Sequence, residues 1–414
     1  MNIYRYEESN KWFDRAVKVI PCGVYGHFSP APYAPVEAYP FFSNKADAAR
    51  FWDVDGNEFI DYMCAYGPMV LGYNHPAVEA AFQEQHSLSD ANSVASPRMV
   101  ELAELLCDLV PVAEWAFFAR NGADVTNLAV MVARAATGRD KVIAIKGGYH
   151  GTSPWMQAPG HHGTIADDHQ HVIRIPWNDL NALDQVLAEH GSQVAAFMAS
   201  PYHHPIFEDN VLPAEGYWQA AIDKLHKNGS VVIVDDVRAG FRLHLGGSNE
   251  HYGFKPDMIA FSKAIANGYA LSALVGTDAL RLDAAKVFHT GSFWYCAGSF
   301  AAAIACLTTL KAEKGPERMR VLGEKLTSGL RDVAAGHGYT LVVSGEPAMP
   351  YLRLADDDTL MLQQAWCGEC TRRGAFFTSH HNWFLSTAHT DGDIEKTLQI
   401  ADDAFKVIKS EFGH

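Results

Sequence analysis

Basic residues are scarce in this chain. It contains 33 lysines and arginines against 48 aspartates and glutamates, which gives a formal net charge of −15 at pH 7. Nucleic acids and anionic membrane surfaces carry dense negative charge and bind to a basic protein face. We therefore expect neither a nucleic acid nor a membrane as a partner.

Long apolar runs are also missing. No uninterrupted apolar stretch approaches the length of a membrane span, and residues 1–9 have no apolar core of the kind found in signal peptides. The seven cysteines are an odd, scattered set without the spacing of a disulfide framework, which is typical of a reducing compartment. The cytoplasm is the expected location.

Two of the cysteines, Cys367 and Cys370, have the C-x-x-C spacing of a redox pair. Such a pair works where a strand delivers the first cysteine to the start of a helix, which lowers its pKa. Residues 359–365, just before it, instead have the pattern of the middle of an amphipathic helix. We interpret the two cysteines as thiols on one helix face.

Internal repeats, low-complexity tracts and Pro/Ser-rich linkers are absent as well. At 414 residues and 48% hydrophobic, the chain can bury a large core. Residues 63–310 alternate helical periodicity with short apolar runs, which predicts an α/β domain with a mostly parallel sheet flanked by helices. The expected strands lie at 142–145, 194–199, 231–235 and 258–261. A smaller α+β domain is expected from residues 1–62 and 311–414, with one strand candidate at 351–354.

Asp235 and Lys263 stand out because each lies where one of these apolar runs gives way to polar residues. The carboxyl ends of parallel strands meet at one edge of a sheet, where open α/β proteins bind ligands. A carboxylate and an amine at one crevice suit pyridoxal 5′-phosphate (PLP): the lysine holds the aldehyde as an imine and the aspartate keeps the ring nitrogen protonated. A buried ion pair or a surface lysine explains the two residues equally well.

Several further segments carry a family resemblance in their order and spacing. The chain resembles the class III (fold type I) PLP-dependent aminotransferases, and most of all their glutamate-1-semialdehyde aminomutase branch. The segments that are similar lie at 53–61, 67–76, 147–151, 235–242, 262–268 and 388–391. The resemblance implies a fold type I PLP enzyme with Lys263 and Asp235 as catalytic residues.

Other residues are expected to hold the cofactor. Gly122 and Ala123 precede a helical stretch, so their N–H groups predict a phosphate site, although a plain capping turn has the same pattern. Ala123 stands where the family usually has a serine or threonine. The resemblance implies that Tyr149 stacks on the ring as part of the catalytic set and that Val237 presses on its opposite face.

The resemblance also implies a homodimer with active sites shared across the interface. Residues 290–293 are similar to a segment that reaches the partner's phosphate, with Ser292 in the position of the usual threonine. A solvent loop is the alternative. Asp236 is expected to lie next to Asp235 without contacting the cofactor. Arg238 stands where the family has a residue near the phenolic oxygen of the cofactor.

The predicted activity is aminotransfer between an amine or amino acid and a keto acid or aldehyde, by a ping-pong mechanism in which Lys263 moves the Cα proton. Two alternatives use other chemistry or none. A PLP-dependent isomerase, meaning an aminomutase or an epimerase, keeps the amino group on its substrate. A PLP-fold protein without catalysis would act by interaction alone.

The substrate is left open by the sequence. The aminomutase pattern places a carboxylate-binding arginine after the segment that corresponds to residues 21–24, and this chain has none there. Residues 200–205 also depart from the family pattern. His27, His203 and His204 either recognise a polar or aromatic substrate or are ordinary loop histidines. The 20 histidines lack thiol partners at metal-site spacing, and we expect no metal.

Overall fold

The computed structural model describes residues 3–26, 30–355 and 357–412, which form two compact units. Unit 1 comprises Met1–His75, Ile206–Asn210 and Glu317–His414, and unit 2 comprises Pro76–Pro205 and Val211–Pro316. The boundaries differ from the expected 63 and 310. Residues 63–75 belong to unit 1, in which the Thr387 N–H donates to the Val70 carbonyl at 2.8 Å. Helix α9 (Ala297–Ala312) continues past 310 within unit 2.

Unit 2 is built on a seven-stranded sheet in the order β4-β10-β9-β8-β7-β5-β6. All its strands are parallel except β10, which is antiparallel to both neighbours. The expected strands are confirmed, and the fold class is α/β as predicted. The bounds are β4 (Trp115–Ala119), β5 (Lys141–Ile145), β6 (Val172–Ile175), β7 (Val194–Ala199), β8 (Val231–Asp235), β9 (Met258–Phe261) and β10 (Ser272–Gly276).

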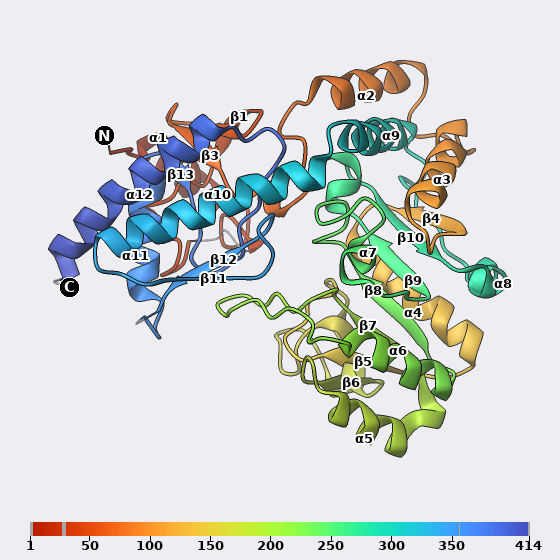
Figure 1. The fold of residues 1–414 in the computed structure, drawn as a ribbon. Helices are drawn as coiled ribbons and strands as arrows, with labels where there is room; N and C mark the ends of the chain where they lie inside the picture. Colours follow the sequence, from red (N-terminus) through yellow and green to blue (C-terminus); the bar gives the residue numbers. More distant parts are fainter. Residues whose placement is uncertain (1–2, 27–29, 356, 413–414) are drawn as a thin grey trace. The chain divides into compact units, whose positions relative to one another are not determined.

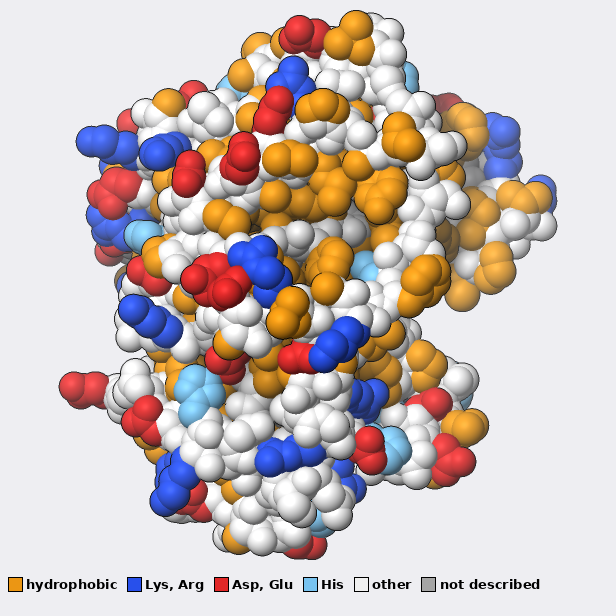
Figure 2. Space-filling view, turned by 90° about the vertical axis from the view of Figure 1, so that its right-hand side faces the viewer, with side chains coloured by type: hydrophobic (Ala, Val, Ile, Leu, Met, Phe, Trp, Pro, Cys, Tyr) orange, Lys and Arg blue, Asp and Glu red, His pale blue; other side chains and the backbone are white. Residues whose placement is uncertain are grey.

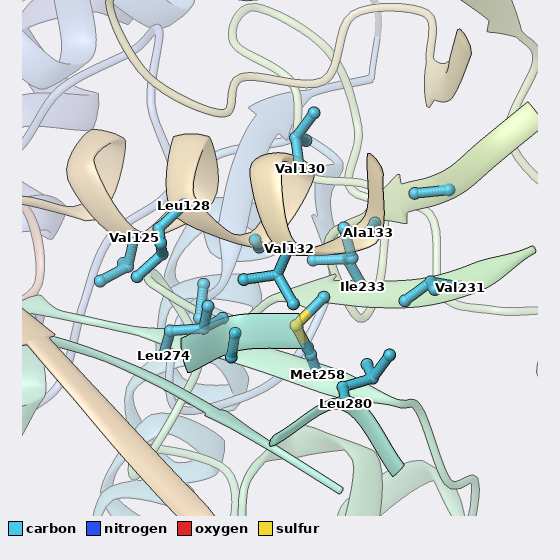
Figure 3. Packing of buried hydrophobic residues seen from close by; sticks show 14 of the residues in the cluster. Val125, Leu128, Val130, Val132, Ala133, Val231, Ile233, Met258, Leu274 and Leu280 are labelled. Atoms are coloured by element: carbon cyan, nitrogen blue, oxygen red, sulfur yellow. The ribbon is translucent and has the colours of Figure 1, made fainter. Parts of the chain in front are cut away.

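Helix α4 (Gly122–Thr137) covers one face of this sheet (Figure 1). Its buried side chains, among them Val125, Leu128 and Val132, pack on strand residues such as Ile233 and Met258 (Figure 3). Successive strand side chains point to opposite faces. Because Val231 and Ile233 belong to the α4 core, Asp235 points to the same face, at the carboxyl end of β8.

The opposite face is covered by α6 (Tyr217–Asn228), whose Trp218 ring lies 6.1 Å from that of Phe197 on β7. With helices on both faces, the central strands are buried throughout, which explains their continuous apolar sequences. The other helices of unit 2 are α2 (Pro76–Leu88), α3 (Pro97–Leu109), α5 (Leu180–His190), α7 (Ser248–Tyr252), α8 (Arg281–Lys286) and α9.

Unit 1 contains more strands than the one expected at 351–354. That strand is β12 (Tyr351–Leu354), paired with β11 (Leu341–Ser344). A separate sheet has the order β1-β2-β3-β13, with β1 (Ser43–Asp47), β2 (Arg50–Asp53), β3 (Glu58–Asp61) and β13 (Ala375–Phe376). These strands are short, and β1 to β3 mix polar with apolar residues, so no long apolar run reveals them. The helices are α1 (Glu7–Ala16), α10 (Gly315–Gly336), nearly all of which belongs to unit 1, α11 (Met361–Thr371) and α12 (Asp391–Phe412).

Cys367 and Cys370 both lie within α11 and both are buried. Burial raises the pKa of each thiol, the reverse of what a redox pair needs. The structure thus supports two helix-face thiols. Among the described residues, no helix is both long enough and apolar enough to cross a membrane.

Candidate active site

A cavity of about 410 Å³ opens in unit 2 at the carboxyl ends of the sheet strands. It brings together nearly all the residues that the sequence predicted for a cofactor site. The lining includes Gly122, Ala123, Tyr149, Asp235, Val237 and Lys263. Ser292 is outside this lining.

Asp235 is buried at the end of β8 and is fixed by two donors. The Nδ1 atom of His150 lies 2.7 Å from Asp235 Oδ2, and since a carboxylate only accepts, the imidazole donates. The backbone N–H of Val237 donates to Asp235 Oδ1 at 3.2 Å. The carboxylate is therefore oriented before any ligand binds.

His150 is a site residue that sequence reasoning passed over. It lay within the 147–151 segment, but its pairing with Asp235 spans 85 residues of chain, and nothing local indicates such a contact. The loop that carries it is attached to α4, because Thr126 Oγ1 donates to the His150 carbonyl at 2.7 Å.

Lys263 follows strand β9, which pairs in parallel with β8. Asp235 is opposite Ala260 in this ladder, so Lys263 comes three residues beyond the carboxylate's partner. The backbone of Lys263 is left-handed, with φ 47°, as is that of Asn267, with φ 45°. Strained backbone of this kind concentrates at functional sites. Burial, reinforced by repulsion from Arg238, lowers the pKa of Lys263 to about 7, although Asp235 acts in the opposite sense.

The start of α4 forms one end of the cavity. Asp124 Oδ2 accepts the N–H groups of Asn121 at 2.8 Å and of Arg120 at 3.2 Å. This holds the turn so that the first helical N–H groups, those of Gly122 and Ala123, face a site suited to an anion. A Cβ on Gly122 would lie 2.9 Å from Val237 Cγ1, so only glycine allows this close approach.

Tyr149 and Val237 also line the cavity. The Tyr149 side chain is 54% exposed, and a large aromatic ring left open beside a cavity has room for a planar partner. Val237 contacts the helix start at Gly122. A flat ligand between the two residues would meet one aromatic and one branched side chain.

His204 and Arg238 add polar groups to the same cavity. Arg238 is buried, and its Nη1 donates to the His204 carbonyl at 3.0 Å. Burial, with Arg238 nearby, holds the pKa of His204 well below its usual range, so its imidazole is neutral. His203 lies outside this cavity, 6.4 Å from the Trp177 ring by ring centroids. His27 lies outside the described residues.

Ser292 is exposed in the segment between α8 and α9. Within one chain, Ser292 does not line the cavity that contains Lys263. Among the described residues, no group of three His, Cys, Asp or Glu side chains is placed to hold a metal ion.

The donor set fits PLP. The N–H groups at the start of α4 suit the phosphate, an oriented carboxylate suits the ring nitrogen, and an amine suits the aldehyde. Tyr149 and Val237 suit the two faces of the ring. The Asp235 carboxylate, which His150 orients, lines one cavity with Lys263 and the helix start, and this combination argues most specifically for a bound group.

Comparison with known proteins agrees with this geometry. The chain is 40% identical over 400 residues to the aminopentol aminotransferase of Sphingopyxis macrogoltabida, covering 97% of this chain and 94% of that protein. It is 31% identical over 434 residues to the glutamate-1-semialdehyde 2,1-aminomutase of Anaeromyxobacter sp., covering 96% and 98%.

Among solved structures, the FumI protein of Sphingopyxis sp. MTA144, determined in its PLP internal aldimine form, superimposes with a TM-score of 0.95 at 39% identity. The match covers 98% of this chain and 97% of that one, which confirms a fold type I PLP enzyme. The family model for class-III aminotransferases matches residues 33–388. The chain therefore belongs to the class-III aminotransferases, enzymes that use PLP to transfer amino groups.

Proposed function

We propose that Lys263, Asp235 and Tyr149 are the catalytic residues for amino transfer from an amine or amino acid to a keto acid or aldehyde in two half-reactions. One observation carries the proposal: Asp235 ends β8, Lys263 follows the neighbouring parallel strand β9, and both line one cavity with the α4 helix start. Gly122, Ala123, Val237 and Ser292 complete the proposed cofactor site.

Each residue has a distinct task. When bound, PLP supplies an aldehyde that takes up an amino group and a ring that stabilises negative charge at the substrate's Cα. Lys263 Nζ, with its pKa lowered to about 7, takes the Cα proton as a neutral amine and returns it. Asp235, oriented by His150, pairs with the protonated ring nitrogen. Tyr149 and Val237 confine the ring, and the N–H groups of Gly122 and Ala123 bind the phosphate.

An amine is the donor that we favour. The aminomutase pattern's arginine after residues 21–24 is missing, and with it a bidentate group for a substrate carboxylate. The relative at 40% identity is named for aminopentol. A panel of amines and amino acids added to the PLP form, without acceptor, tests this donor class by the rate of the spectral change.

The chain is further proposed to form a homodimer in the cytoplasm, with Ser292 reaching the partner's phosphate site. Figure 2 shows hydrophobic side chains gathered in a patch on one face of the molecule. Exposed apolar residues of unit 2 include Leu88, Val94, Phe288 and Phe293, and large exposed apolar surface is typical of interfaces. None of the seven cysteines forms a disulfide, which fits a reducing compartment.

An isomerase is the second candidate, favoured by the 31% identity to an aminomutase. The acceptor-free experiment separates the two. An aminotransferase converts its cofactor once and stops until a carbonyl acceptor is added. Sustained turnover of one substrate without any acceptor would instead establish an isomerase.

The proposal is tested by Lys263→Ala. Borohydride treatment should fix the cofactor to the parent chain but not to the variant, as seen by intact mass. Turnover should fall by about 10²–10⁴-fold, the usual contribution of an acid–base residue. Lys146→Ala removes an exposed lysine outside the cavity and should change neither result. A Lys263→Ala protein with nearly full turnover would show that another residue moves the proton.

A further inference from the structure

The turn that carries Lys263, residues 262–272, has a strained backbone. Lys263 and Asn267 are both left-handed, with φ 47° and 45°, and Gly268 follows with φ 102°. A left-handed conformation is unfavourable for residues other than glycine, and it persists only where surrounding contacts impose it. Those contacts therefore determine where the Lys263 side chain begins.

The two ends of this turn are fixed by strands β9 and β10. Ala273 on β10 is opposite Phe261 on β9, and Ser262 Oγ donates to the Leu271 carbonyl at 3.0 Å. The residues between these ends need contacts of their own to hold the left-handed positions.

Tyr269 attaches the turn to helix α2. Its backbone N–H donates to the Ala266 carbonyl at 3.1 Å, and Ala266 ends the helical turn that Lys263 begins. Its hydroxyl donates to Glu79 Oε2 at 2.7 Å. Its ring stacks on that of Phe82, with 4.1 Å between the ring centroids and 20° between the ring planes. The backbone and the side chain of Tyr269 thus join the turn of Lys263 to α2.

Helix α2 is itself packed along α9. The Phe82 ring lies against Gly298 at the start of α9, where a Cβ would approach Phe82 Cε2 to 2.7 Å. Further along α9, the Cys306 thiol donates to the Ala264 carbonyl at 3.4 Å. The turn of Lys263 is therefore held from both helices.

We propose that Tyr269 is a positioning residue for Lys263: by tying the turn to α2, it maintains the left-handed backbone of the lysine and directs the amine to the aldehyde of PLP. The inference rests on the role proposed for Lys263. In joining PLP, the lysine nitrogen bonds to the aldehyde carbon, and the aldehyde oxygen leaves as water with two hydrogens from the amine. The strength of this attachment depends on where the amine is held, because reacting groups are sensitive to small displacements.

Three substitutions separate the ring contact from the hydrogen bond. Tyr269→Leu removes both, Tyr269→Phe removes only the hydrogen bond, and Glu79→Gln keeps a side-chain oxygen that can accept it. Tyr4→Leu is a matched control in unit 1, because the Tyr4 hydroxyl donates to the Glu58 carbonyl and the ring packs edge-on against Phe59. Thermal unfolding of each variant establishes that it is folded.

The measurement is the dissociation constant of PLP, obtained by equilibrium dialysis of the full-length protein freed of cofactor. Each substitution is made both in the parent chain and in the Lys263→Ala chain. With Lys263 present, Tyr269→Leu should raise the Kd about tenfold, Tyr269→Phe about threefold and Glu79→Gln less than about twofold. In the Lys263→Ala chain, where the lysine cannot bond to PLP, each should change the Kd less than about twofold. Tyr4→Leu should leave the Kd unchanged in both chains.

Two outcomes overturn the proposal. If Tyr269→Leu weakens PLP binding equally in both chains, Tyr269 supports the cavity as a whole and does not act through the lysine. If it weakens binding in neither chain, the turn holds Lys263 in place without Tyr269. An error in the role of Lys263 itself is recognised separately, because borohydride would then fix PLP to the Lys263→Ala chain.

Discussion

Asp235 and Asp236 are neighbours in the chain but lie in different surroundings. Asp235 lines the cavity and is bonded by His150. Asp236 is fully buried away from the cavity, where Oδ2 accepts the Ser248 N–H at 2.7 Å and Oδ1 accepts the Ser248 hydroxyl at 2.6 Å. Alternation along β8 places the two side chains on opposite faces of the sheet.

Substitution should reveal this difference. Asp235→Asn should still bind PLP but slow removal of the Cα proton greatly, since an uncharged amide cannot keep the ring nitrogen protonated. Asp236→Asn should do much less. Single-turnover rates with one amine donor measure both effects. Equal damage from both substitutions would mean that the roles of the two carboxylates are assigned wrongly.

Asp236 should also affect how stability depends on pH. Burial raises its pKa to about 7 in the folded chain, against about 3.9 when unfolded. The folded state thus binds the proton more tightly, and this stabilisation is complete below about pH 4 and lost as pH rises through about 7. The Asp236→Asn variant does not lose stability in this way, because its amide has no such proton to release. The Tm of the variant minus that of the parent should therefore increase from pH 5 to pH 8, and a constant difference would contradict the shift.

At the scale of elements, the loop after β5 and the start of α4 fit together through small residues. Gly151 has φ 129°, and a Cβ there would lie 2.7 Å from the Ala123 Cβ and 3.0 Å from its Cα. The same loop carries Tyr149 and His150. Displacing this loop would move Tyr149 from its proposed contact with the cofactor ring and His150 from its bond with Asp235. It would also disturb the start of α4, which is proposed to bind the phosphate.

We expect Gly151→Ala to lower the free energy of unfolding and to speed PLP release. The strained backbone alone costs about 1–3 kcal/mol, and the contact with Ala123 adds to it. Gly160→Ala is the control, because Gly160 also has a positive φ, 84°, but a Cβ there would meet nothing within 4 Å. Thermal unfolding and the rate of PLP release to a trapping reagent measure both. Identical losses from the two variants would show that the loop is not packed on α4 as described.

At the scale of the whole molecule, shared active sites predict complementation. Mixing Lys263→Ala with Ser292→Ala should give heterodimers in which one site carries both lesions and the other carries neither, so activity should recover. Mixing Lys263→Ala with Asp235→Asn should not restore activity, because both residues line the cavity of the same chain. A fully active monomer in dilute solution would refute sharing.

The sequence by itself determined four strands of the central sheet, β5, β7, β8 and β9, together with Asp235 at the end of β8 and Lys263 just after β9. Buried parallel strands need continuous apolar runs, so the strands at 231–235 and 258–261 could be predicted from the sequence. The positions of Asp235 and Lys263 at their carboxyl ends followed from that prediction. Polar strands such as β1 gave no such run. Strands β4, β6 and β10 were not predicted, and the reversed direction of β10 leaves no mark in a short apolar segment.

Only the tertiary structure decided how these residues act together. The bond from His150 to Asp235 joins residues 85 apart, and the presence of Arg238 and Lys263 in one cavity depends on the segment after β8 meeting the segment after β9. The close approach at Gly151 likewise depends on a helix start packing on a distant loop. Contacts across the chain and shifts in pKa arise from distance and burial, which residue order does not specify.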